Sequence, residues 1–399
     1  MPQSHERAGS AMRGATRLAF SAVIGVTRTV EQMHSNIAAG SSPIGDGTNG
    51  RTEGISGFVY ECIRLAHRGT GFGADQVMSL VDKMWIRQPT LPQPQWDSVL
   101  GVLNGIVGDQ LASSENPLAI PMQLRRNGRR VDPGDRSLGQ KPLILVHGLC
   151  MNDRRWSRDG HDHGRELERD LGYSPLYLFY NTGRHISQNG RELSALLEEF
   201  VLESSGSDQE ITILAHSMGG LVVRSAHEAA AELGHTWPRG LRRIVFLGTP
   251  HHGAPLERIG HWIDRKVAGS PYMAPIANLA LVRSAGIMDL REGALVDEDW
   301  EDTDSEDAVR RLPKSIALPK GVHCHAIAAT LSEQDQNSNH DFLGDGLVPI
   351  KSALGQHSDP MRSLNFESTH QWTTTSTSHF ELLSDREVYA AIRSWFDED

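Results

Sequence analysis

Six short apolar or β-branched runs, separated by segments of helical periodicity, constrain the fold of this chain most strongly. The runs are 142–148, 174–182, 210–217, 241–250, 322–331 and 361–367. Helical patterns lie between several of them, including 190–204 and 219–233. Strands that alternate with helices are typical of βαβ units, whose parallel sheet is buried on both faces. We therefore expect an α/β fold with a mostly parallel central sheet flanked by helices.

The two ends of this α/β pattern carry further signals. Asn127-Gly128 lies between two short segments within 121–133, and this dipeptide predicts a two-residue hairpin that would make the sheet mixed. Residues 385–396 predict a C-terminal helix packed on the sheet, because their apolar residues recur on one side. The long insertion at about 253–320 is expected to be a cap or lid. Its apolar element would be residues 273–282. Its acidic run, residues 297–302, is expected to be a solvated face, and a calcium site is the alternative.

The first third of the chain reads as mainly helical and contains no chemical motif. Apolar residues from Ala15 to Ile37 recur at helical spacing, and 38–57 is rich in Gly and Ser. We expect an amphipathic helix and linker over 1–57, a helical region over 58–117, and a catalytic domain over 118–399. The first helix is expected to pack on the protein; contact with a membrane or a partner, and a secretion signal, are the alternatives.

The charge and cysteine content exclude several classes of protein. Lys and Arg total 39 against 50 Asp and Glu, so the net charge of −11 argues against nucleic-acid binding. Cys62, Cys150 and Cys324 are few and far apart, which predicts neither a disulfide framework nor a zinc site. A cytoplasmic location is favoured, with membrane association or secretion as alternatives. The sequence predicts no cofactor, no transmembrane span and no particular oligomeric state.

A serine stands where an apolar strand pattern becomes a helical one, in the stretch Ala215-His216-Ser217-Met218-Gly219. A tight strand-to-helix turn requires small residues on both sides of the nucleophile, because the helix must approach the strand closely. Alanine replaces the commoner glycine at 215 but is still small. We predict that Ser217 is a catalytic nucleophile; a helix-capping role is the alternative.

A nucleophilic serine needs a base and an orienting acid, which follow it in the chain order Ser, Asp or Glu, His on this type of sheet. Asp345 lies between two glycines after the strand at 322–331, and His379 lies directly before the last helix. These residues are predicted to complete the triad. Asp341, in the same loop as Asp345, is the competing candidate for the acid. His370, which lies closer to the preceding strand, is the competing candidate for the base.

An oxyanion hole needs backbone N–H donors on either side of the nucleophile. Met218 follows the serine, and Leu149 lies in the loop after the strand at 142–148, where Gly148 permits a sharp turn. Leu149 and Met218 are therefore predicted to be the donors. His216 should point away from the serine and act as a packed, supporting residue.

Together, "LVHGL", "LAHSMGG", "LGTPHHG", "DGLVP" and "SHFELL" resemble the α/β-hydrolase superfamily, in its lipase-like branch with bacterial triacylglycerol lipases and inositol-deacylase-like hydrolases. The resemblance covers about 121–399. It agrees with the triad and the oxyanion donors, and implies that His147 and Gly148 border the oxyanion hole. It also implies that His251 and His252 shape the pocket floor; a two-histidine metal site there is the alternative.

These observations predict a serine hydrolase of carboxylic esters with a small-molecule or lipid-like substrate, acting through an acyl-enzyme. Acyl transfer or amide cleavage by the same triad is the alternative within enzymes. A non-catalytic, hydrolase-like docking module is the alternative from another class. Some lipases of the related branch hold zinc, but His161 and His163 lack a zinc spacing and are expected in a polar surface loop, so no metal is predicted.

Overall fold

The structure is a computed structural model, and it describes residues 93–134, 141–203, 210–255, 284–301, 312–333 and 344–397. Contacts divide the chain into two compact units. Residues 100–259 and 283–399 form one unit, and the described residues of the other are 93–99. The expected amphipathic helix, the linker, most of the helical region and the apolar cap element at 273–282 lie outside the described residues.

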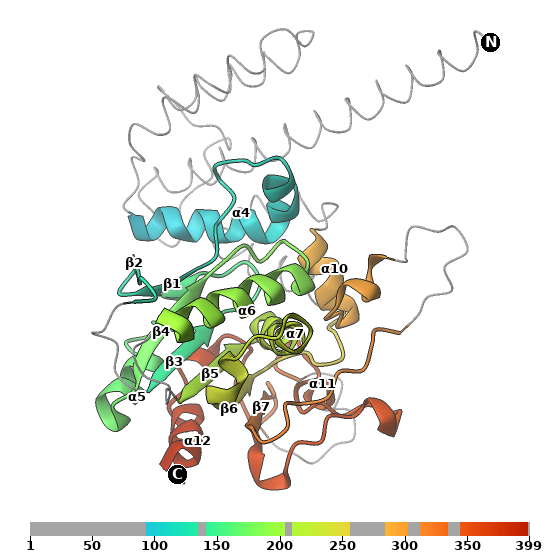
Figure 1. The fold of residues 1–399 in the computed structure, drawn as a ribbon. Coiled ribbons are helices and arrows are strands. Elements are labelled where there is room, and N and C mark those ends of the chain that lie inside the picture. Colours follow the sequence, from blue (N-terminus) through green and yellow to red (C-terminus); the bar gives the residue numbers. More distant parts are fainter. Residues whose placement is uncertain are drawn as a thin grey trace, which may run out of the picture. The chain divides into compact units, whose positions relative to one another are not determined.

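The larger unit is built around an eight-stranded sheet with the order β2-β1-β4-β3-β5-β6-β7-β8 (Figure 1). The strands are β1 (Gln123–Arg126), β2 (Arg129–Arg130), β3 (Pro142–Val146), β4 (Ser174–Phe179), β5 (Ile211–His216), β6 (Leu241–Leu247), β7 (His323–Ala329) and β8 (Gln371–Thr374). From β4 to β8 all neighbours are parallel. The mostly parallel sheet is therefore confirmed.

The predicted hairpin is also confirmed. β1 pairs antiparallel with β2 and with β4. Asn127 and Gly128 connect β1 to β2 with φ angles of 52° and 74°, the left-handed conformation that this two-residue turn requires. The hairpin adds the antiparallel edge expected from the sequence.

One predicted strand is wrong. The segment 361–367 begins as a short 3₁₀ turn, and its Leu364 and Phe366 are buried as loop anchors. The last strand is β8, in a stretch whose polar sequence is typical of a loop; its Trp372 and Thr373 pair with Ile327 of β7 and the residue after it. β8 is a short edge strand with one apolar residue, so apolar runs do not reveal it.

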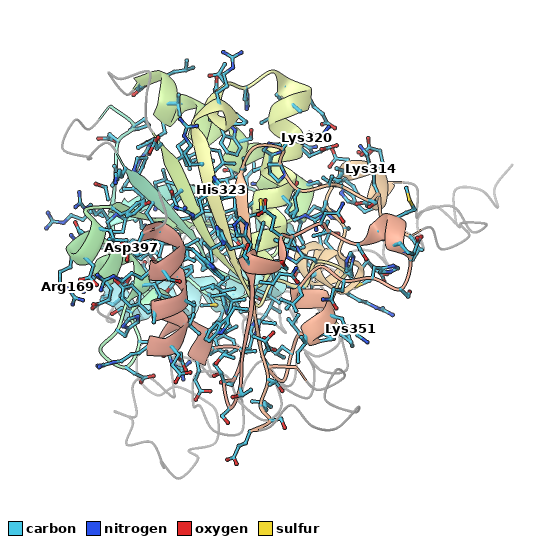
Figure 2. The ribbon with its side chains drawn as sticks, turned by 90° about the horizontal axis from the view of Figure 1, so that it is seen from below. Arg169, Lys314, Lys320, His323, Lys351 and Asp397 are labelled. Carbon is cyan, nitrogen blue, oxygen red and sulfur yellow. The ribbon has the colours of Figure 1, made fainter. Side chains whose placement is uncertain are left out.

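Helices cover both faces of the sheet. They are α4 (Gln93–Ser113), α5 (His163–Leu171), α6 (Ile186–Glu203), α7 (Met218–Leu233), α10 (Ala285–Glu292), α11 (Ile350–Ala353) and α12 (Arg386–Asp397). Alternate strand residues such as Leu145 and Leu214 join a core with Leu167 of α5 and Ile392 of α12. Figure 2 shows α5 and α12, which carry Arg169 and Asp397, next to each other. The C-terminal helix is thus confirmed.

The opposite face is covered by α6 and α7, which pack against each other. Gly220 at the start of α7 lies so close to the sheet that an added Cβ would be 2.8 Å from a ring carbon of Phe246 on β6. Both helices were predicted from their apolar periodicity. Among the described helices, none has the length and apolar content needed to cross a bilayer.

Helix α4 packs through a glycine-lined side on the loops that follow β3 and β4. A Cβ on Gly101 would lie 2.6 Å from the carbonyl oxygen of Met151, and one on Gly105 would overlap Cys150. Asn181, after β4, donates a 2.8 Å hydrogen bond to the carbonyl of Gly108. The last part of the region expected to be helical, 58–117, is thus a helix, and α4 holds the loops at the carboxyl edge of the sheet.

Candidate active site

Ser217 occupies the turn between β5 and α7, where the sequence placed it. Its φ of 56° and ψ of −128° lie outside the ordinary regions for a residue with a side chain. The Ser217 N–H donates to the carbonyl of Leu247 at 2.9 Å, which ties the turn to the end of β6. At 9% exposure, the side chain is nearly buried.

Gly219 permits this turn. A Cβ at this position would overlap the carbonyl oxygen of Val146 and lie 2.7 Å from that of His147. Both atoms are backbone at the end of β3, so neither can rotate away. The small residue predicted at 219 is therefore required by the close approach of α7 to β3.

Asp345 and His379 form a buried pair. His379 Nδ1 lies 2.6 Å from Asp345 Oδ2, and the two side chains are 3% and 1% exposed. The other carboxylate oxygen accepts the N–H groups of Leu347 and Val348 at 3.0 and 2.8 Å. These bonds fix the carboxylate, so His379 Nδ1 donates to it and Nε2 is left without a proton in the neutral ring.

The end of β6 brings this pair to the serine turn. A Cβ at Gly248 would lie 3.1 Å from Asp345 Oδ2 and 3.2 Å from His379 Cε1, and the preceding residue accepts the Ser217 N–H. His216 Nε2 donates to the carbonyl of His379 at 2.9 Å, with 4.6 Å between the ring centroids. The structure therefore gathers Ser217, Asp345 and His379 in one place and sets His216 beneath the histidine as a support.

Ser217 Oγ has no hydrogen-bond partner in the described ranges. In unliganded sites of this type, hydrogen bonds to the nucleophile are often long and tighten only around substrate. Burial holds the pKa of His216 well below its usual value, so this neighbouring ring is neutral and does not compete as a base.

The residues expected to donate to the oxyanion lie next to Gly148 and Ser217 in the chain, and their role stays a prediction. A Cβ at Gly148 would lie 2.9 Å from Ser217 Cβ, so the loop after β3 passes directly against the serine. Leu149 is the next residue in that loop, and Met218 is the first residue of α7, where helix N–H groups lack helical partners. Cys150 has a φ of 57° and donates its N–H to Thr182 Oγ1 at 3.2 Å, which anchors the loop.

His147 lies beneath this loop. Its ring stacks on Tyr180 at 4.6 Å, and the Tyr180 hydroxyl donates to the His147 carbonyl at 2.7 Å. Burial lowers the pKa of His147 to about 4, so the ring is neutral at pH 7. Tyr180 is a supporting residue that the sequence did not reveal, and the role of His147 at the border of the oxyanion hole stays a prediction.

His251 and His252 line a cavity whose walls include none of Ser217, Asp345 and His379. His251 is buried against Phe246 and Phe366. The expected place in the floor of the substrate pocket therefore stays a prediction.

The prediction that residues 161–163 lie in a polar surface loop is wrong. His163 is fully buried as the first residue of α5, and His161 is 8% exposed. His161 Nε2 and His163 Nδ1 are 2.8 Å apart, and His163 Nε2 donates to the carbonyl of Leu382. Burial lowers the pKa of His163 to about 3, and the pair ties α5 to the segment before α12. In the part of the chain that the structure describes, no three His, Cys, Asp or Glu side chains cluster as metal ligands.

The acidic run beginning at Asp297 is more than a solvated face. Asp297 forms an ion pair with Arg191 of α6. Asp299 Oδ2 accepts the N–H of Leu295 at 2.8 Å, and its other oxygen accepts the N–H of Lys314 at 2.7 Å. These carboxylates therefore fasten the segment after α10 to the body of the unit.

The competing triad candidates have different placements. Asp341 lies outside the described residues. His370 is half-buried next to His325, with 4.1 Å between the ring centroids.

Sequence reasoning also missed Gly248, whose φ of 55° and lack of a side chain make room for the acid and the base. Its position directly after an apolar strand was the available signal.

Comparisons with known proteins found one family model and distantly similar solved structures. A family model described as a domain of unknown function, DUF7379, matches residues 173–281. No curated protein matches the chain. Among solved structures, the mature lipase BlEst2 of Bacillus licheniformis is 16% identical with a TM-score of 0.39, and the match covers 69% of this chain and 97% of the lipase. A thermophilic esterase from Thermogutta terrifontis is 14% identical with a TM-score of 0.37, over 70% and 93% of the two chains.

These identities and TM-scores are too low to assign the fold. The fold follows instead from features of this chain itself. The mostly parallel eight-stranded sheet has helices on both faces. Its serine turn follows a central strand, and the acid and histidine come later in the chain at the carboxyl edge. The chain has the α/β-hydrolase fold.

Proposed function

We propose that this chain is a serine hydrolase that cleaves carboxylic esters through an acyl-enzyme. The observation that carries the proposal is the buried 2.6 Å contact between His379 Nδ1 and Asp345 Oδ2 beside a serine held at a positive φ. A fold alone does not imply a function, but this arrangement supplies a nucleophile, a base and an orienting acid.

The reaction would begin with proton transfer from Ser217 Oγ to His379 Nε2. Asp345 holds the ring in the tautomer that leaves Nε2 free and stabilises the imidazolium that forms. Ser217 Oγ then attacks the acyl carbon, and the N–H groups of Leu149 and Met218 stabilise the oxyanion. His379 returns the proton to the leaving alcohol. Water, deprotonated by the same histidine, then attacks the acyl carbon, and the histidine returns that proton to Ser217 Oγ as the acid leaves.

The substrate class is the finer part of the proposal. We propose a small-molecule or lipid-like ester. The triad chemistry is common to ester hydrolysis, amide hydrolysis and acyl transfer, so the triad does not distinguish them. The motif resemblance to bacterial triacylglycerol lipases is what supports hydrolysis of an ester.

Labelling with a fluorophosphonate probe tests the nucleophile directly. We expect the wild-type chain to be labelled, Ser217→Ala to be unlabelled, and the matched control Ser394→Ala to be labelled like wild type, because Ser394 is exposed on α12. p-Nitrophenyl esters of increasing acyl length then test the substrate class. A folded wild-type chain that resists labelling, or labelling that persists in Ser217→Ala, would contradict the proposal.

A further inference from the structure

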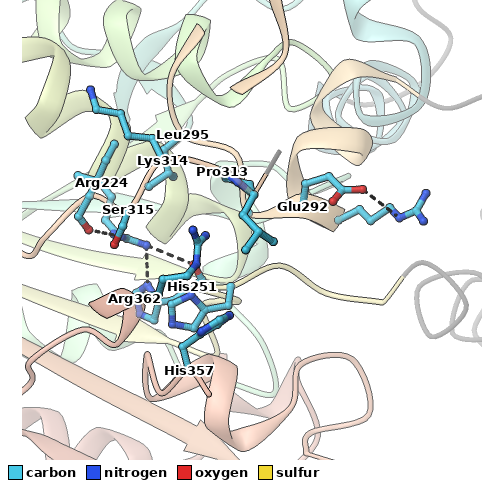
Figure 3. Close-up of a pocket in the computed structure, with 14 residues that line it drawn as sticks. Arg224, His251, Glu292, Leu295, Pro313, Lys314, Ser315, His357 and Arg362 are labelled. Atoms are coloured by element: carbon cyan, nitrogen blue, oxygen red, sulfur yellow. Dashed lines mark hydrogen bonds and ion pairs between the residues drawn. The ribbon is translucent and has the colours of Figure 1, made fainter. Parts of the chain in front are cut away.

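One cavity of about 160 Å³ lies between α7, the loop after β6 and the segment 312–316 (Figure 3). Its wall includes Arg224, His251 and Arg362. Arg224 is seven residues after Ser217 on α7, which corresponds to about 10 Å at about 1.5 Å rise per residue. The cavity would hold roughly five water molecules at about 30 Å³ each, or one small anion with a few of them.

Arg224 is a buried cation that has no carboxylate partner among the residues that the structure describes. It is 4% exposed, and its Nη2 donates to the carbonyl of Ile316 at 2.5 Å and its Nη1 to that of His251 at 3.4 Å. Burial lowers the pKa of Arg224 only to about 10, so the guanidinium is charged at pH 7. Its buried Nε has no hydrogen-bond partner. A buried charge is normally paired, because its desolvation is costly.

Two other side chains that line the cavity each have a buried nitrogen atom without a hydrogen-bond partner among the described residues. One is Nε of Arg362, a guanidinium that can only donate. The other is Nε2 of His251. His251 Nδ1 lies 3.5 Å from Arg224 Nη1, which is also only a donor, so the ring hydrogen belongs on Nε2. Arg224, Arg362 and His251, which all line the cavity, therefore each contain one nitrogen atom that has no hydrogen-bond partner among the described residues.

The charges at the cavity are not balanced by the described residues. Lys314 pairs with Glu228 at 3.4 Å, and Arg291 with Glu292 at 3.4 Å. Within the same described ranges, no ion pair is formed by Arg224 or Arg362. Two guanidinium charges remain, which a doubly charged anion would neutralise.

The donors come from three separate parts of the fold. Arg224 is on α7, His251 follows β6, and Arg362 follows α11. His357 adds a fourth: its Nδ1 accepts the N–H of Asp359 at 3.0 Å, so its hydrogen is on Nε2. Donors from several directions suit a tetrahedral oxyanion, and the arginine fork is well matched to phosphate.

We propose that this cavity is a binding site for a phosphate-type dianion, held chiefly by Arg224 and Arg362. The site is separate from the serine turn, and binding of the anion does not depend on hydrolysis. Its ligand is inorganic phosphate or the phosphate group of a small phosphorylated molecule, which share this chemistry.

Calorimetric titration of the full chain with inorganic phosphate at constant ionic strength tests the site. We expect saturable one-site binding, and a melting temperature that rises with phosphate concentration. Arg362→Gln should weaken phosphate affinity by about 10-fold or more, because it removes a charge-assisted contact from a partly exposed side chain. Arg242→Gln is the matched control, since this exposed arginine pairs with Glu210 away from the cavity.

Two further variants keep the test decisive. Arg224→Lys retains the charge but loses the guanidinium fork, and should also weaken binding. Ser217→Ala should bind phosphate like wild type, which separates failure of this site from failure of the proposed hydrolase activity. Competition by glycerol phosphate would indicate a phosphorylated ligand, and its absence the free ion. No saturable phosphate binding by the folded wild type, or equal binding by Arg362→Gln and Arg242→Gln, would overturn the proposal.

Discussion

Replacing Asp345 with asparagine should abolish the proposed hydrolase activity without unfolding the chain. In the structure, Asp345 Oδ1 accepts the N–H groups of Leu347 and Val348, and Oδ2 faces His379 Nδ1 at 2.6 Å. Backbone N–H groups can only donate, so the amide oxygen of the asparagine would keep the Oδ1 position. Its NH₂ group would then face His379 Nδ1.

This arrangement reverses the histidine tautomer. In Asp345→Asn, Nδ1 would have to accept a hydrogen bond from the new side-chain amide, so the ring hydrogen would move to Nε2, which could no longer take the proton of Ser217. In a serine-protease triad the equivalent change lowers turnover about 10⁴-fold. At about 1.36 kcal/mol per factor of ten, this is about 5 kcal/mol of lost transition-state stabilisation.

The assay is kcat/KM on a p-nitrophenyl ester, with urea unfolding of each variant as the check on folding. We expect Asp345→Asn to lose about 10³ to 10⁴-fold in kcat/KM, with a urea midpoint close to that of wild type. Asp341→Asn, the matched change at the competing acid, should retain near wild-type turnover. A loss below about 10-fold in a folded Asp345→Asn variant, or an equal loss in Asp341→Asn, would refute the reasoning.

Three further predictions concern packing, pH and thiol reactivity. Gly219→Ala should lower urea stability by about 1–3 kcal/mol and slow probe labelling, because its Cβ would meet backbone oxygens of β3; Gly134→Ala, with its nearest contact at 3.5 Å, should do neither. The pKa of His163 is about 3 when folded and about 6.5 when unfolded, so as pH falls from 6.5 towards 3 the unfolded chain binds the extra proton. Urea stability should therefore fall by about 1.4 kcal/mol per pH unit from this group, and His163→Gln should show a shallower fall between pH 7 and 5. Burial raises the pKa of Cys150 and Cys324 to about 12, so in a Cys62→Ser variant iodoacetamide should modify the folded chain slowly at pH 8, as mass spectrometry would show.

The sequence predicts the parallel core well because strands that are buried on both faces of a sheet are continuous runs of apolar residues. Residues 142–146 and 211–216 are buried throughout, and both appear as continuous apolar runs. This apolar signal is absent at the sheet edge. The edge strand β8 has only Trp372 among polar residues, whereas the apolar pattern of Leu364 and Phe366 lies in a loop. Local apolar content reports burial, and burial coincides with strand structure only in the interior of the sheet.

The same limit applies to polar side chains. His161 and His163 look like surface residues in the sequence, yet His163 is fully buried because Leu382 supplies a carbonyl partner from a distant part of the chain. Arg224 likewise has an ordinary place in a helical pattern. Its burial follows from the carbonyl of Ile316, which lies 92 residues away. Partners this remote cannot be read from spacing, so the cavity around Arg224 was beyond sequence analysis.

The geometry of the candidate triad depends on where side chains are absent. Gly148, Gly219 and Gly248 each lie where a Cβ would meet an atom of the site: Ser217 Cβ at 2.9 Å, the carbonyl of His147 at 2.7 Å, and Asp345 Oδ2 at 3.1 Å. Ala215, by contrast, has its Cβ accommodated within the fully buried strand β5. The motif can therefore depart from glycine at 215 while retaining it at 219, because the close backbone approach occurs only after the serine. Triad geometry in this chain is consequently more sensitive to a methyl group at these three glycines than to the first position of the motif.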